Sequence, residues 1–199
     1  MIAPDRYRGP DGGGDAMALG ANGYGTTARV LHWLVAALIL AMIPVGVIMV
    51  REGLDRGFQD ALFIFHKNVG SLLIALVALR LVWRLTHPPA PLPAHLPGWQ
   101  RRAAGLSHLA LYVLMIAMPL SGYVRVRAGG FPIEALDAIG LPPLVPRSEA
   151  LADAASALHQ GAAWALVAVL ALHVGAGLHH ALILRDGVWQ RIWPPRARP

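Results

Sequence analysis

Four long apolar segments constrain the fold of this chain more than any other feature. Each is long enough to cross about 30 Å of hydrocarbon as an α-helix. The segments cover approximately Val30–Val50, Ala61–Trp83, Leu106–Val124 and Leu158–Leu184. Because no water is available inside a bilayer, a spanning segment must satisfy its own backbone polar groups, and an apolar run of this length does so as a helix. The sequence therefore predicts an all-α integral membrane protein, a four-helix bundle.

The composition agrees with a membrane protein and excludes several kinds of site. The chain is 56% hydrophobic and 14% charged, whereas soluble domains average about 25% charged residues. It has no cysteine, which excludes disulfides, iron–sulfur clusters and thiolate ligation of haem. The net charge of +6 comes from arginines that flank the apolar segments, a pattern typical of membrane orientation. We therefore expect a lipid bilayer and no nucleic acid among its partners.

The distribution of basic residues predicts how the bundle is oriented. Eleven arginines flank the segments on one side, and six basic residues, mixed with acids, flank them on the other. The larger set is Arg6, Arg8, Arg29, Arg80, Arg84, Arg101, Arg102, Arg185, Arg191, Arg196 and Arg198. Positively charged loops stay in the cytoplasm, so we expect both termini to be cytoplasmic. The proline-rich run His87–Pro97 is expected to be a loop on that side.

Histidines inside the apolar segments are the candidate functional residues. His159 and His173 are fourteen residues apart, which places them within about 40° on one helix face and about 21 Å apart along the axis. His32 begins the first segment and His66 the second. The predicted orientation puts His66 and His159 near the periplasm, and His32 and His173 near the cytoplasm. Each pair could supply both axial nitrogens of a six-coordinate haem iron.

Three roles without haem fit these histidines less well. A lone histidine can hydrogen-bond a neighbouring helix without binding a metal. Zinc needs several ligands within about 2.1 Å of one point, which imidazoles about 21 Å apart cannot provide. A proton relay would call for intramembrane Asp or Glu, and the four segments contain none. Haem fits the pattern better.

Two further histidines leave the cytoplasmic site open to alternatives. His180 lies seven residues after His173 and shares its helix face, so it is a rival for the second ligand. His108, at the start of the third segment, either contacts a haem propionate or faces lipid headgroups. Four glycines would leave room for a macrocycle or would only allow close helix packing: Gly46, Gly70, Gly161 and Gly175.

Six short motifs surround these histidines: Arg29–Trp33 (RVLHW), Phe65–Gly70 (FHKNVG), Ser107–Leu109, Leu158–Gln160, Leu172–His173 and His179–His180. Together they resemble the bacterial cytochrome b561 family over about residues 24–193. The resemblance implies a dihaem b-type cytochrome of the inner membrane, with ubiquinone as the exchangeable redox partner. It implies that two haem b groups are ligated by four histidines: His32, His66, His159 and His173. The expected organisation is a flexible leader (1–23), the transmembrane domain (24–193) and a tail (194–199).

The expected activity is quinone-linked electron transfer, and the resemblance adds superoxide oxidation for some members. Four basic residues on the periplasmic side either attract such an anion or are ordinary interfacial and loop charges: Lys67, Arg125, Arg127 and Arg147. One alternative is an anchor subunit that carries electrons between quinone and a partner dehydrogenase or hydrogenase, with an amphipathic piece, Ile133–Ile139, available for docking. Another is a transporter or scaffold without redox chemistry.

Overall fold

The structure, a computed structural model, describes residues 23–193. The expected leader, apart from Gly23, and the expected tail lie outside the described residues, as do Arg6, Arg8, Arg196 and Arg198. Within the described part the elements are helices and connecting loops, without a β-strand.

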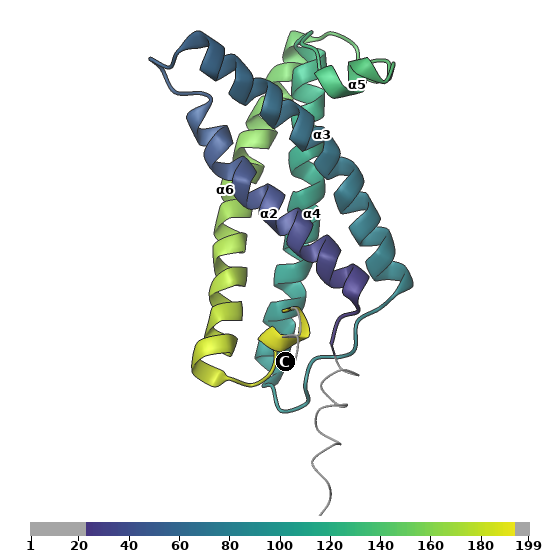
Figure 1. Cartoon of the computed structure of the whole chain (residues 1–199), viewed down its shortest axis with the longest axis vertical. Coiled ribbons are helices and arrows are strands. Elements are labelled where there is room, and N and C mark those ends of the chain that lie inside the picture. Colours follow the sequence, from purple (N-terminus) through teal and green to yellow (C-terminus); the bar gives the residue numbers. More distant parts are fainter. Residues whose placement is uncertain (1–22, 194–199) are drawn as a thin grey trace, which may run out of the picture.

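Four long helices run up and down the molecule (Figure 1). They are α2 (Thr26–Ile48), α3 (Arg56–Thr86), α4 (Gly98–Ala128) and α6 (Glu149–Leu178), and α6 continues as a π-helix, η1 (His179–Leu184). All four are long and apolar enough to cross a membrane. The prediction of an all-α, four-helix membrane bundle is confirmed.

Most helix ends reach beyond the apolar segments because local signals, not the membrane boundary, set them. The Asp55 carboxylate accepts a hydrogen bond from the Phe58 N–H before α3, and the Ser148 hydroxyl accepts one from the Leu151 N–H before α6. Such caps satisfy N–H groups that have no partner inside the helix. At the other end of α3 the proline-rich run stops the helix.

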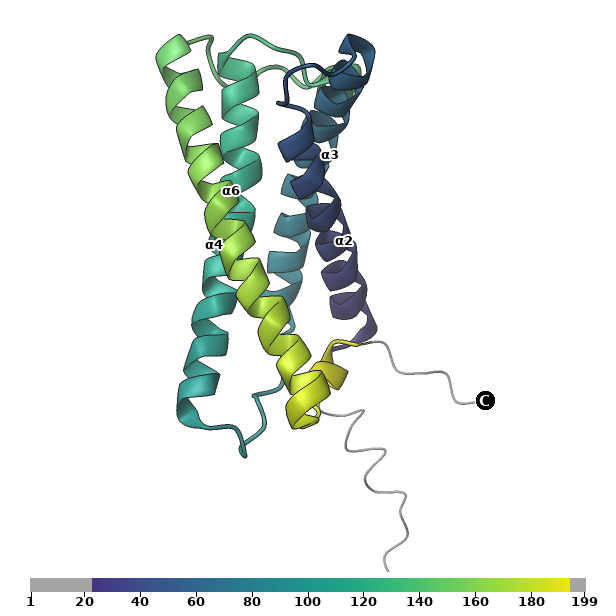
Figure 2. The same ribbon diagram turned by 90° about the vertical axis from the view of Figure 1, so that its left-hand side faces the viewer.

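The four helices pack as two pairs (Figure 2). Helix α4 lies along α6, and α2 packs on α3 through a cluster of four buried side chains, Val35, Met42, Leu73 and Val77. Helix α3 also contacts α4, whereas α6 makes no comparable backbone contact with α2 or α3. The predicted histidine pairs span this wider separation between α6 and the α2–α3 pair.

Both ends of the described chain meet at one end of the bundle, called here the inner end. The Tyr24 N–H donates to the Arg191 carbonyl at 2.9 Å, and the Trp33 indole N–H donates to the Ile192 carbonyl at 3.1 Å. The rings of Trp189 and Trp193 pack against Trp33, so the segment after α6 closes over the start of α2. Four membrane-spanning helices bring both ends of the described chain to the same side of the membrane. The cytoplasmic position of this side stays a prediction.

The opposite, outer end carries a short helix, α5 (Glu134–Ala138), inside the expected amphipathic piece. Two ties hold α5 in place. Lys67 on α3 forms an ion pair with Glu134 at 2.6 Å, and the buried Arg127 at the end of α4 pairs with Asp137. The outer loop is therefore anchored to two of the long helices.

Candidate functional site

The outer histidine pair joins α3 to α6. The rings of His66 and His159 have centroids 6.3 Å apart and are inclined at 76°. Two helices that do not pack closely thus direct one imidazole each toward the same point. The pairing expected from depth in the membrane is present.

The inner histidine pair joins α2 to α6 in the same way. The ring centroids of His32 and His173 lie 6.4 Å apart with an angle of 62° between the ring planes. Helix α6 therefore contributes one imidazole to each pair, as its fourteen-residue spacing predicts.

Both separations suit a metal ion between the two rings. An imidazole nitrogen lies about 2 Å from a bound metal and about 1.1 Å from its own ring centre, so two opposed ligands have centroids about 6 Å apart. In the outer pair, His159 has a hydrogen-bond partner suited to such a role, whereas Nδ1 of His66 is buried without one. Nδ1 of His159 lies 2.9 Å from the Met118 carbonyl, and donation there would leave Nε2 free to bind a metal.

Two glycines make room for the outer rings. A Cβ placed on Gly46 of α2 would lie 3.1 Å from Cε1 of His66, and one placed on Gly122 of α4 would lie 3.1 Å from Cε1 of His159. Contacts this short would force the ring to move. The sequence indicates Gly46 as a candidate but gives no sign of Gly122, because nothing along the chain shows that α4 backs His159.

The other candidate glycines have different surroundings. A Cβ on Gly70 would meet Met42 at 3.8 Å, which is ordinary packing. A Cβ on Gly161 or Gly175 would meet no described atom within 4 Å. That these two glycines line a slot for a macrocycle stays a prediction.

At the inner site the geometry favours His173 over its rival. Nδ1 of His180 lies 2.6 Å from the Asp186 carboxylate, which also accepts a hydrogen bond from the Val188 N–H. Burial opposes ionisation of Asp186, but the hydrogen bond with His180, backbone hydrogen bonds and the charge of His180 together outweigh it, so the pKa of Asp186 lies below its usual value. His180 is thus held by the chain that follows α6, whereas His173 faces His32.

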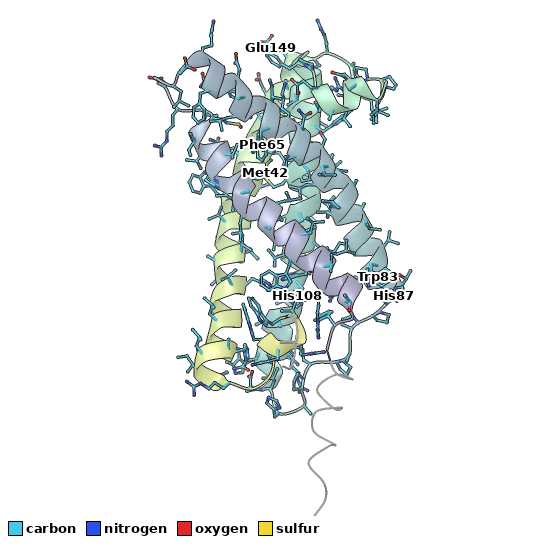
Figure 3. The ribbon with its side chains drawn as sticks, in the orientation of Figure 1. Met42, Phe65, Trp83, His87, His108 and Glu149 are labelled. Carbon is cyan, nitrogen blue, oxygen red and sulfur yellow. The ribbon has the colours of Figure 1, made fainter. Side chains whose placement is uncertain are left out.

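A third imidazole joins the inner site. The ring centroid of His108 on α4 lies 5.6 Å from that of His173, and Figure 3 shows His108 toward the inner end. The sequence places His108 at this end of the membrane but does not indicate its contact with His173. His87 is elsewhere: it stacks on Trp83 at 3.9 Å at the end of α3, and His95 is exposed in the loop.

Comparison with known proteins identifies the family of this chain. The family model described as prokaryotic cytochrome b561 matches residues 23–195. The chain belongs to this family. It is therefore a multi-pass bacterial membrane cytochrome, and membership implies binding of haem b and a role in electron transport.

Three curated relatives of this cytochrome cover most of its length. Cytochrome b561 homolog 2 of Escherichia coli K12 is 35% identical over 170 residues, which are 85% of this chain and 90% of the relative. Cytochrome b561 homolog 1 of the same organism is 28% identical over 179 residues, which are 88% of this chain and 99% of the relative. The probable superoxide oxidase CybB of Yersinia pestis is 29% identical over 173 residues, which are 83% of this chain and 93% of the relative.

The basic residues at the outer end of this cytochrome b561 are partly neutralised. Partial burial opposes ionisation of Glu134, yet hydrogen bonds from Lys67, the backbone and Asn68, together with the charge of Lys67, outweigh it and hold the pKa of Glu134 below its usual value. The hydrogen bond from Arg127 lowers the pKa of Asp137 in the same way. Of the four expected cations, Arg125 and Arg147 have no acid partner among the described residues, and Arg147 instead donates weakly to the Gly130 carbonyl at 3.4 Å.

Proposed function

We propose that this protein is a dihaem b-type cytochrome of the bacterial inner membrane. One haem b would be ligated by His66 and His159, and the other by His32 and His173. The observation that carries the proposal is that each pair has the ring separation, 6.3 and 6.4 Å, that two axial imidazoles on one iron require. Each haem would be held by two imidazoles and would supply one-electron transfer.

Bound haem supplies one-electron redox chemistry, and the protein supplies ligation and insulation. Helix α6 holds His159 and His173 at two levels, about 21 Å apart by helical rise. Helices α2 and α3 bring the opposing imidazoles to those levels. The carbonyl of Met118 orients the His159 ring. This arrangement suits electron transfer from one side of the membrane to the other.

We propose ubiquinol and ubiquinone as the partners that exchange electrons with this cytochrome. Family membership supports a respiratory role, and the apolar exterior of the helices gives a lipid-soluble carrier access to the protein from the bilayer. The excess of arginines at the inner end supports a cytoplasmic position for both termini.

Superoxide is a second candidate electron donor at the outer end, on the strength of the Yersinia relative. Attraction of an anion there would depend on Arg125, whose charge acts on both outer imidazoles, more than on Lys67, which is already paired. Arg125→Gln should slow superoxide-driven haem reduction at low salt, and Lys67→Gln should slow it less. Equal rates in the wild type and Arg125→Gln would remove this role.

The alternative role, an anchor subunit for a partner dehydrogenase or hydrogenase, is favoured by one feature of the outer loop. Three large apolar side chains beyond the membrane-spanning helices are strongly exposed: Phe131 at 64%, Ile139 at 76% and Leu144 at 71%. A contiguous patch of such side chains would mark a contact surface. Purification from native membranes as a stable complex would favour the anchor, and a lone protein reduced by quinol would favour the self-contained oxidoreductase.

The decisive test of the main proposal is the haem content and visible spectrum of the purified protein. We expect two haem b per chain, a b-type reduced-minus-oxidised spectrum and reduction by ubiquinol in vesicles. A colourless protein made with ample haem would decide for a scaffold. One haem per chain would contradict the dihaem assignment.

A further inference from the structure

Two arginines on α3 form a cationic cluster close to the inner histidines. Arg80 and Arg84 are one helical turn apart, and both guanidinium groups lie over the ring of Tyr112, at 5.8 and 5.6 Å from its centroid. Both side chains are partly buried. Tyr112 on α4 therefore holds the two cations side by side.

Neither arginine has an acidic partner in the described part of the chain. The three ion pairs found there involve other residues. Seven of the eight described acids lie at or near the outer end, and the eighth, Asp186, is engaged by His180. In addition, Nε of Arg80 is buried without a hydrogen-bond acceptor. A buried polar group without a partner is costly, which points to an anion that the protein chain does not supply.

The cluster lies at the level of the inner site, because the hollow that both arginines line also includes Leu31, the residue before His32. The charge of Arg80 acts on all three inner imidazoles, those of His32, His108 and His173. Both arginines line a small hollow at the inner end, together with residues that include Tyr24, Trp83 and Tyr112. An anion bound there would lie beside the group that the inner histidines hold.

We propose that Arg80 and Arg84 bind the carboxylates of the inner porphyrin. The inference rests on the proposed function, because it requires a haem between His32 and His173. A haem carries two propionates on one edge, and guanidinium groups match carboxylates through paired, charge-assisted hydrogen bonds. The phosphate of an anionic phospholipid has similar oxygen chemistry, so the experiment must separate the two sources.

The experiment compares haem with haem dimethyl ester, in which both carboxylates are blocked. The full-length protein is produced in haem-deficient cells supplied with either porphyrin, and release of the inner porphyrin to an acceptor protein is timed. In the wild type the ester should leave the inner site about tenfold faster than haem, because charge-assisted hydrogen bonds are lost. In Arg80→Gln/Arg84→Gln the two porphyrins should leave at similar rates. Release from the outer site should not change.

Two variants control for charge and for folding. Arg101→Gln/Arg102→Gln removes two exposed arginines from the same end and should keep the wild-type discrimination. Arg80→Lys/Arg84→Lys keeps the charges but not the paired geometry, and should give intermediate discrimination. An unchanged spectrum of the outer haem shows that a variant is folded.

Two results would overturn the inference. The first is a wild-type inner site that releases haem and its ester equally fast, a measurement that needs no variant. The second is an Arg80→Gln/Arg84→Gln protein that still discriminates but has lost bound phosphatidylglycerol in native mass spectra, which would assign the cluster to lipid. A protein that binds no haem would contradict the proposed function itself, so the two failures are distinguishable.

Discussion

The imidazole of His66 on α3 occupies the space left by the missing side chain of Gly46 on α2. An added Cβ would lie 3.1 Å from Cε1 and 3.7 Å from Nδ1 of the ring. Since α2 and α3 are fixed to each other by the buried cluster around Val35 and Val77, the backbone at Gly46 cannot easily withdraw. The position of this ring therefore depends on a residue that contributes no side chain.

Gly46→Ala should loosen the outer haem while leaving the inner one in place. Overpacking at a rigid site costs about 1–3 kcal/mol, so we expect the outer haem to be released at least several-fold faster, with a shifted reduction potential. The measurement is a redox titration combined with haem transfer to an acceptor. Gly105→Ala is the matched control, because a Cβ at Gly105 meets nothing within 4 Å; equal behaviour of the two variants would argue against the contact.

His66→Ala and His159→Ala should each reduce the haem content from two to one per chain. No other described imidazole makes a ring contact with the outer pair, so no substitute ligand is available. Pyridine haemochrome analysis against protein concentration gives the ratio. His95→Ala, in the exposed loop, should retain two haems, and a similar loss in that variant would show that the effect is not specific to the pair.

The inner site should respond differently, because three imidazoles meet there. His173→Ala should abolish the inner haem, since both His32 and His108 face His173. His32→Ala should retain part of it, with His108 as the replacement ligand, and His32→Ala/His108→Ala should lose the remainder. Electron paramagnetic resonance of the oxidised variants reports the change of ligand. Complete loss in His32→Ala alone would exclude His108 as a ligand.

The tie between Lys67 and Glu134 should make the stability of the outer loop depend on pH. Because the folded-state pKa of Glu134 is lowered, its contribution is present above the unfolded value of about 4.3 and is lost as the pH falls through the folded value. Glu134→Gln should lower the melting temperature at pH 7 by about 2–4 °C, if the tie contributes about 1 kcal/mol. The difference should vanish near pH 3, and a difference independent of pH would contradict an ionic tie.

The fold and the pairing of the histidines follow from one-dimensional features of the sequence. Apolar length predicts the four helices, and depth in the membrane is enough to match His66 with His159 and His32 with His173. On the sequence, depth alone cannot separate His173 from His180, because a regular helix places both on one face near its inner end. The choice depends on Asp186, which reaches His180 only because the chain turns after η1, with Arg185 in a left-handed conformation.

The sequence alone does not predict contacts between helices that are far apart along the chain. Gly122 backs His159 across thirty-seven positions, and His108 reaches His173 across sixty-five. The same holds for Lys67 and Glu134, which on the sequence are a free cation and an ordinary loop acid. Their pairing requires α5 to fold back over α3, and no periodicity in either segment predicts this contact.

Because α6 provides one imidazole of each pair and is the last of the four long helices that the structure describes, neither pair exists while the ribosome is still making the three helices before it. A nascent chain that ends before residue 159 contains His32 and His66 without the opposing rings. If the pairs ligate haem as proposed, porphyrin can be bound from both sides only after α6 has entered the bilayer beside α4. Acquisition of colour would then report that all four of these helices are in the membrane.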